Sequence, residues 1–303
     1  MTHLNLQGFI PAPFTCFSED GTINVKPIAA YAQLLKNKGA VGAFILGTTG
    51  EGVTMTIAER KQVAEEWIKH QSNSFQVIVH VGGPSITSSL ELARHACEIG
   101  AAAISLMAPI FFRPASVQAL VEYVSSVAQE CPKLPVYFYH IPSMTDVNLS
   151  MPEFLHEADE RIPNLAGIKF THHDMMEYNE CIMYGDGKYH VMHGFDEVLL
   201  CGLALGVKAA VGSTYNYFLP PYLRLKAAFE SGDLDNAREL QAVSVQLVRI
   251  LMKYGGGLTA GKAIMSFVGV DCGPCRMPTP SLSLNQRREM RADLEKMDFF
   301  SLC

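Results

Sequence analysis

One lysine is a candidate nucleophile. Lys169 lies in the stretch Leu-Ala-Gly-Ile-Lys-Phe-Thr, in which the neighbours are apolar or small. Loss of hydration favours the neutral amine over the ammonium ion, and a neutral amine attacks a ketone to form a Schiff base. A lysine at the end of a strand can also reach solvent or pair with a carboxylate, so the position alone leaves both interpretations open.

Three other groups could serve such a lysine. Tyr139 ends an apolar run and could move protons with its hydroxyl, although a core aromatic explains it equally well. The loop at residues 47–52 offers backbone N–H groups and the hydroxyls of Thr48 and Thr49, which suits a carboxylate, but a tight turn would look the same. Asp196 and Glu197 could bind a polyol, yet taken alone they favour the first turn of a helix.

Two further motifs are weaker. Cys272 and Cys275 have the spacing of a redox pair, but the two prolines that follow oppose the helix such a pair opens. His172 and His173 suggest a metal ligand, yet adjacent residues on a strand point to opposite faces. We therefore predict that Cys272 and Cys275 do not form a catalytic disulfide. We predict that His172 and His173 lie in a surface turn and do not bind zinc or another metal.

The elements that must position these residues alternate along the chain. Eight short runs are apolar throughout, as in parallel strands covered on both faces. They lie at residues 8–15, 42–47, 76–83, 102–109, 135–142, 165–171, 189–195 and 209–214. Segments with helical periodicity separate them, with Asn24, Thr56, Ser88, Ser150 and Ser283 as predicted N-terminal caps. This alternation predicts an α/β fold, a (β/α)8 TIM barrel, rather than an open doubly wound sheet, which usually has fewer strands.

Helical segments continue after the eighth run. They cover residues 233–254, 259–268 and 283–297. We expect a catalytic barrel at residues 1–232 and a C-terminal helical extension packed on it at residues 233–303. In a TIM barrel the active site lies at the C-terminal ends of the strands, where Tyr139, Lys169 and Asp196 would stand.

Composition excludes several classes of protein. The chain has 303 residues, of which 49% are hydrophobic and 18% charged, so it can bury a large core. A net charge of −6 argues against nucleic acid as a partner. The longest apolar run, residues 101–112, is too short to cross a bilayer, and the N-terminal residues do not read as a secretory signal. Eight scattered cysteines indicate free thiols in a reducing, cytoplasmic setting.

Three motifs carry a family resemblance that spans nearly the whole chain. Residues 47–51, Tyr139 and residues 167–170 resemble the dihydrodipicolinate synthase/N-acetylneuraminate lyase superfamily of class I aldolases. Within it, residues 139–142, 194–197 and 211–216 look like the N-acetylneuraminate lyases, closest to the animal form.

The resemblance implies a role for each matching residue. Lys169 would form the Schiff base, Tyr139 would act as acid and base with help from Thr48, and Thr48 with Thr49 would bind the carboxylate of pyruvate. The substrate hydroxyls would be held by Thr171, Gly194, Asp196, Glu197 and Ser213. No metal or organic cofactor is implied, because the lysine itself supplies the electron sink.

Two positions bear on which member of the superfamily this is. Synthases usually carry an arginine where this chain has Met144, and a thioether cannot pair with a carboxylate. Many members place a tyrosine of a neighbouring subunit where this chain has Phe111, which cannot relay a proton. The first departure favours the lyase, and the second removes the inter-subunit relay.

The resemblance therefore implies a homotetramer that degrades sialic acid by reversible cleavage of N-acetylneuraminate to N-acetylmannosamine and pyruvate, and the scattered cysteines predict that it is cytosolic. The alternatives are another pyruvate-dependent aldolase or dehydratase, and an inactive sugar-acid-binding protein. Retention of both Lys169 and Tyr139 argues against the inactive protein. A redox protein that uses Cys272 and Cys275 would require a pair with unusual thiolate character.

Overall fold

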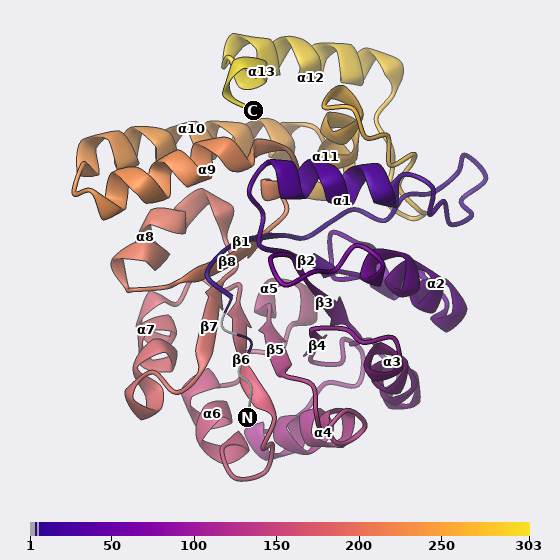
Figure 1. Cartoon of the computed structure of the whole chain (residues 1–303), viewed down its shortest axis with the longest axis vertical. Coiled ribbons are helices and arrows are strands. Elements are labelled where there is room, and N and C mark those ends of the chain that lie inside the picture. Colours follow the sequence, from indigo (N-terminus) through magenta and orange to yellow (C-terminus); the bar gives the residue numbers. More distant parts are fainter. Residues whose placement is uncertain (1–3, 5) are drawn as a thin grey trace.

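The computed structural model describes residue 4 and residues 6–303 of the chain, and its centre is an eight-stranded parallel sheet (Figure 1). The sheet order is β1-β8-β7-β6-β5-β4-β3-β2. The two outermost strands in this order are β1 and β2. The N–H of Val41, directly before β2, donates to the carbonyl of Phe9 in β1 over 3.0 Å. The predicted TIM barrel is confirmed, with strands shorter than the apolar runs. They are β1 Gly8–Pro11, β2 Gly42–Ile45, β3 Gln76–His80, β4 Ala103–Met107, β5 Val136–His140, β6 Leu165–Phe170, β7 His190–His193 and β8 Ala209–Gly212.

Helices separate the strands and cover the outside of the barrel (Figure 1). Their bounds are α1 Ile28–Asn37, η1 Gly52–Thr54, α2 Ile57–Ile68, α3 Ile86–Glu98, α4 Val117–Gln129, α5 Pro142–Thr145, α6 Met151–Ala158, α7 Met175–Met183, η2 Tyr184–Asp186, η3 Asp196–Val198, α8 Leu199–Ala204 and α9 Tyr215–Glu230. Within residue 4 and residues 6–303, none of the helices combines the length and apolar character that a membrane span requires.

Three of the five predicted N-terminal caps are confirmed. Thr56 and Ser283 each form a complete capping box, and Ser150 accepts a hydrogen bond from the N–H of Glu153. In each case the side-chain oxygen satisfies an N–H that the helix itself leaves free.

The other two caps were wrong. The carboxamide of Asn24 accepts from the N–H of Lys26, which makes a turn ahead of the helix, and α1 begins only at Ile28. In α3 the cap is Ser85, whose hydroxyl accepts from the N–H of Ser88, so Ser88 lies within the first helical turn. Both errors arise because several polar residues near a helix start compete for the same N–H groups.

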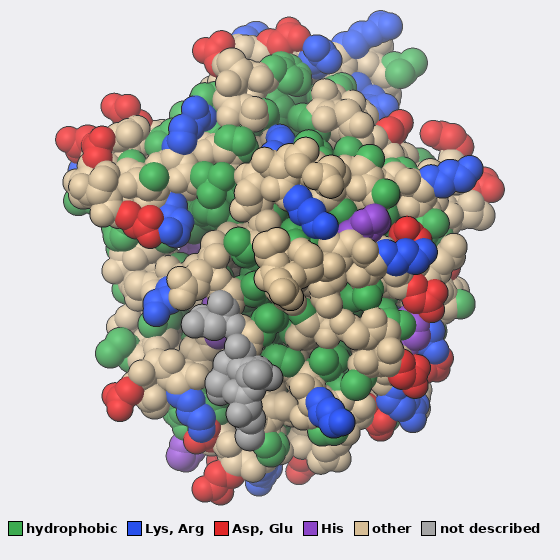
Figure 2. Space-filling model, in the orientation of Figure 1, with side chains coloured by type: hydrophobic (Ala, Val, Ile, Leu, Met, Phe, Trp, Pro, Cys, Tyr) green, Lys and Arg blue, Asp and Glu red, His purple; other side chains and the backbone are tan. Residues whose placement is uncertain are grey.

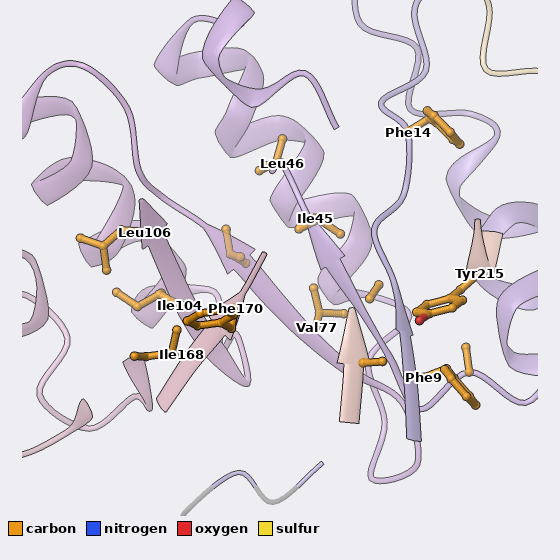
Figure 3. Close-up of a cluster of buried hydrophobic side chains, with 14 of the residues drawn as sticks. Phe9, Phe14, Ile45, Leu46, Val77, Ile104, Leu106, Ile168, Phe170 and Tyr215 are labelled. Carbon is orange, nitrogen blue, oxygen red and sulfur yellow. The ribbon is translucent and has the colours of Figure 1, made fainter. Parts of the chain in front are cut away.

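The core has two layers because side chains alternate across each strand. Phe44, Tyr137 and Tyr139 belong to the layer inside the barrel. Ile168 and Phe170 belong to the layer between strands and helices, part of which is drawn in Figure 3. The inward-facing positions at the C-terminal end of the barrel are therefore the ones open to chemistry.

The C-terminal helices stack on one side of the barrel, where α10 runs along α9 (Figure 1). Phe299 stacks on Phe218 of α9 with ring centroids 5.3 Å apart. We propose residue 232 as the boundary of the barrel, since α9 completes the last strand–helix unit. The helices are α10 Leu234–Lys253, α11 Gly256–Phe267, α12 Leu284–Lys296 and α13 Phe299–Leu302, the last of which we did not predict.

Charged side chains are spread over the surface. On the face drawn in Figure 2, Lys and Arg side chains and Asp and Glu side chains are both spread over the surface. This arrangement agrees with the net charge of −6 and does not resemble the basic stripe of a nucleic-acid-binding surface.

A buried ion pair joins the extension to the barrel. The ammonium of Lys262 on α11 lies 2.7 Å from the carboxylate of Glu51 in the loop after β2, and their side chains are 3% and 1% exposed. Lys262 also donates to the carbonyl of Pro274, and Glu51 accepts from the N–H of Arg276. The extension therefore supports the loop that follows β2.

Lys262→Met should destabilise the protein strongly, because it leaves the Glu51 carboxylate buried without its cation. Breaking such a pair costs about 3–5 kcal/mol. Lys61→Met removes a partly exposed pair with Glu91 and should cost about 0–1 kcal/mol. Urea denaturation of both variants at one protein concentration measures the difference in their free energies of unfolding. Equal urea midpoints for Lys262→Met and Lys61→Met would contradict the importance of the buried pair.

Candidate active site

Lys169 and Tyr139 are direct neighbours in the barrel. They are paired residues of β6 and β5. The amine of Lys169 lies 3.9 Å from the ring centroid of Tyr139 and 4.5 Å from that of Phe44 on β2. Lys169 is 5% exposed and forms no ion pair within the described part of the chain. The structure thus contradicts a lysine neutralised by a carboxylate and leaves its amine available for nucleophilic chemistry.

A histidine that the sequence analysis overlooked completes this group. His80 ends β3 and packs edge-on against Tyr139, with ring centroids 5.9 Å apart. Arg60 donates to the carbonyl of His80 over 2.7 Å. Burial first, and then the charges of Arg60 and Lys169, lower the pKa of His80 well below its usual value. A neutral His80 therefore faces the phenol of Tyr139. In the sequence, the feature that could have indicated His80 as a site residue is a histidine within an otherwise apolar run.

The loop after β2 turns sharply. Leu46 and Glu51 have positive φ angles of 64° and 54°. A Cβ atom on Gly52 would lie 1.9 Å from the carbonyl oxygen of Leu46, so only glycine fits there. The tight-turn interpretation of this loop is confirmed.

The hydrogen bonds of this turn do not use the hydroxyls of Thr48 and Thr49. Glu51 donates its N–H to the carbonyl of Thr48, and Gly52 donates to Gly47. The hydroxyls of Thr48 and Thr49 make no hydrogen bond to any described residue. These two threonines therefore keep the polar groups that a carboxylate could use.

Thr171 and Gly194 meet across β6 and β7. A Cβ atom on Gly194 would lie 1.9 Å from Oγ1 of Thr171, so the close approach requires glycine. The N–H of Thr171 continues the β5–β6 pairing by donating to the carbonyl of His140 over 2.9 Å. Its buried hydroxyl has no partner among the described residues, which is the state expected of a group that serves a ligand.

Asp196 begins the short helix η3, so its helix-start interpretation is confirmed. Its Oδ2 accepts from the N–H and the hydroxyl of Thr214, over 2.9 and 2.6 Å. Burial raises the pKa of this carboxyl group to about 6. Oδ1 has no hydrogen-bond partner within the described residues. Asp196 thus holds the loop after β8, which carries the half-buried Ser213, and Glu197 lies half-buried beside it.

The strand register therefore brings some of the predicted residues together directly. It places Tyr139 beside Lys169, and Thr171 beside Gly194. Thr48 and Thr49 follow β2, and Phe44 of that strand has its ring centroid 4.5 Å from the amine of Lys169.

The redox hypothesis finds no support in the thiols. Burial raises the pKa of Cys275, and a hydrogen bond with Cys16, followed by burial, raises that of Cys272. A reactive cysteine needs the opposite shift. Cys272 and Cys275 therefore read as structural residues.

The two adjacent histidines diverge. The ring of His172 approaches that of His140, with centroids 5.5 Å apart, whereas exposed His173 stacks on Phe195. The predicted turn is confirmed, but His172 also joins His140 and Glu177 in a cluster that the sequence analysis did not foresee.

A cavity of about 330 Å³ lies at the other end of the barrel. Tyr137 and His190 line it, and both lie near the N-terminal ends of their strands. None of the predicted site residues borders this cavity, so we do not assign the chemistry to it.

Comparison with known proteins now identifies the family. Residues 5–297 match the profile of the dihydrodipicolinate synthetase family. The chain belongs to this family. The predicted superfamily is therefore confirmed, over nearly the whole chain.

Several members of this family that resemble the chain are named as lyases of sialic acid, and others as dihydrodipicolinate synthases. N-acetylneuraminate lyases of Rattus norvegicus and Pongo abelii are 38% and 39% identical over 300 residues, which is 98% of this chain and 94% of each relative. The solved lyase of Proteus mirabilis has a TM-score of 0.94 and 40% identity, and covers 97% of this chain and 99% of its own. A Ruminococcus gnavus sialic acid aldolase has a TM-score of 0.89 and 26% identity, with 97% and 98% coverage.

Borohydride reduction in the presence of pyruvate should label Lys169. The amine is buried and unpaired, so it can form the imine that the hydride then fixes. Mass spectrometry of peptides locates the added mass. Lys169→Arg should abolish the label, and Lys208→Arg, at the other end of the barrel, should retain it. Labelling of another lysine with Lys169 unmodified would refute the assignment.

Proposed function

We propose that this protein is a class I aldolase that cleaves N-acetylneuraminate reversibly to N-acetylmannosamine and pyruvate, in sialic acid degradation. The observation that carries the proposal is the buried amine of Lys169, which has no carboxylate partner among the described residues and lies against the ring of Tyr139. The relatives at 38% and 40% identity are N-acetylneuraminate lyases, whereas a similar dihydrodipicolinate synthase is 25% identical, which supports the lyase.

The chemistry follows from this pair. The amine of Lys169 adds to the ketone of the open-chain sugar, and loss of water gives a protonated imine. As the C3–C4 bond breaks, its electrons move into the imine and form an enamine, while Tyr139 takes the proton of the C4 hydroxyl and passes its own phenolic proton, through Thr48, to the substrate carboxylate. The aldehyde product leaves. Protonation of the enamine at C3 and hydrolysis of the imine release pyruvate and restore the lysine.

Substrate binding is assigned to the polar groups around the pair. Thr48 and Thr49 would hold the carboxylate through their free hydroxyls, and Thr48 would assist Tyr139. The sugar hydroxyls would meet the unpaired oxygens of Thr171 and Asp196. Gly194, Glu197 and Ser213 complete this set.

The sugar specificity rests partly on Met144, which is exposed on α5 just beyond Tyr139. A thioether there offers nothing to the carboxylate of a second substrate such as aspartate semialdehyde. The purified protein should therefore release pyruvate from N-acetylneuraminate. Coupling to lactate dehydrogenase measures this. Condensation of pyruvate with aspartate semialdehyde, without activity on sialic acid, would make the protein a synthase instead.

We further propose that the enzyme works in the cytosol as a homotetramer. The eight cysteines of the chain all lie within the described residues and are free thiols, which suits a reducing compartment. Phe111 and Phe112, in the loop after β4, are 78% and 84% exposed and pack edge-on against each other. Exposed apolar pairs of this kind usually contact a partner, and a second copy is the partner we propose.

Phe111→Asp should weaken the assembly, because a carboxylate would be desolvated in an apolar contact. Phe111→Tyr should keep both assembly and measurable turnover, since the proton transfer is assigned to Tyr139. Sedimentation velocity and pyruvate release test both variants. Leu284→Asp, at an equally exposed position on α12, is the matched control and should assemble normally. An unchanged oligomer in Phe111→Asp would refute this contact.

A further inference from the structure

A second group of polar side chains lies on the outer side of the strands that carry Tyr139 and Lys169. His140 follows Tyr139 and faces the opposite way, because neighbouring side chains on a strand alternate. His172 comes from the loop after β6, and Glu177 comes from α7. One potential ligand atom of each residue lies within 4.8 Å of the other two.

His140 is the unsatisfied member of this group. It is 2% exposed and packs against Phe170, with ring centroids 5.1 Å apart. Its Nε2 has no hydrogen-bond partner among the described residues, and Oε2 of Glu177 lies 3.7 Å away, beyond hydrogen-bond distance. Burial lowers the pKa of His140 to about 3, with the neighbouring His172 second. A buried ring nitrogen without a hydrogen-bond partner is costly, and a ligand can remove that cost.

Glu177 has a fixed carboxylate that could neutralise a cation bound to His140. Its Oε1 accepts from the N–H of Met151 over 2.8 Å, which fixes the carboxylate. Its Oε2 is the oxygen nearest to His140. Burial raises the pKa of Glu177, and no Lys or Arg among the described residues pairs with it. A cation placed between Glu177 and the two rings would remove this desolvation cost.

We propose that His140, His172 and Glu177 bind a divalent transition-metal ion of the zinc type. Two imidazoles and one carboxylate suit such ions, with water in the fourth position. Bonds of about 2.0–2.2 Å in a tetrahedron put the ligand atoms about 3.4 Å apart. The observed 3.7 Å between His140 and Glu177 is close to that spacing. The hydrogen bond to Met151 orients the carboxylate, as groups around metal ligands commonly do.

The position of the site determines what the ion does. It lies in the layer between the barrel and α7, on the far side of the strands from the amine of Lys169, so it takes no part in the proposed chemistry. An ion there joins the end of β5, the loop after β6 and α7. It would therefore hold together the two strands that carry Tyr139 and Lys169.

Titration calorimetry with zinc chloride, on full-length protein first treated with a chelator, tests the proposal without an activity assay. The wild type should bind one ion per chain, and its melting temperature should rise with zinc. His172→Gln and Glu177→Gln should each weaken binding at least about tenfold. Glu177→Gln keeps an oxygen for the N–H of Met151, so it retains that structural contact.

His173→Gln is the matched control, because His173 is adjacent to His172 but exposed and outside the cluster. It should bind zinc as the wild type does. Cobalt(II) gives a second readout, since tetrahedral coordination produces strong visible absorption that only the wild type and His173→Gln should show. The proposal would be overturned if the wild type did not bind zinc, or if His172→Gln and Glu177→Gln bound zinc as tightly as the wild type. Circular dichroism confirms that each variant is folded.

Discussion

The register between β5 and β6 is the constraint on which this site depends. It pairs Tyr139 with Lys169, and both side chains point into the barrel because their positions on the two strands match. A slip of one residue would turn the lysine toward the helices and bring Phe170 inside. The same alternation sends His140 and Phe170 outward, so one register defines both the proposed active site and the proposed metal site behind it.

Burial then decides the chemical state of the groups that this register brings together. Loss of hydration leaves His80 neutral beside the phenol of Tyr139 and raises the pKa of Asp196 to about 6. Asp196 is consequently ionised at neutral pH but sits near its titration range. One of its oxygens is already committed to Thr214, and the other, which has no hydrogen-bond partner among the described residues, is the one we propose for a sugar hydroxyl.

The helical extension contributes to the site from a distance. Lys262 on α11 neutralises Glu51, and the chain around Arg276 caps the same carboxylate. Glu51 has a positive φ angle and closes the loop that carries Thr48 and Thr49. Residues far along the chain thus support the turn that is proposed to hold pyruvate, which gives the extension a structural role in the barrel's function.

The sequence by itself determined the elements and singled out the lysine that we propose as nucleophile. Strands buried on both faces must be apolar throughout, so eight such runs predicted the barrel, and a lysine within one of them was conspicuous for the same reason. Thr56 and Ser283 were predictable because capping is local, whereas Asn24 and Ser88 failed where neighbouring polar residues competed. Only the tertiary structure decided that His80 faces Tyr139, that Lys262 pairs with Glu51, and that His140 meets His172 and Glu177. These contacts join segments far apart in the chain, and no local pattern encodes them because they depend on how strands and helices pack in three dimensions.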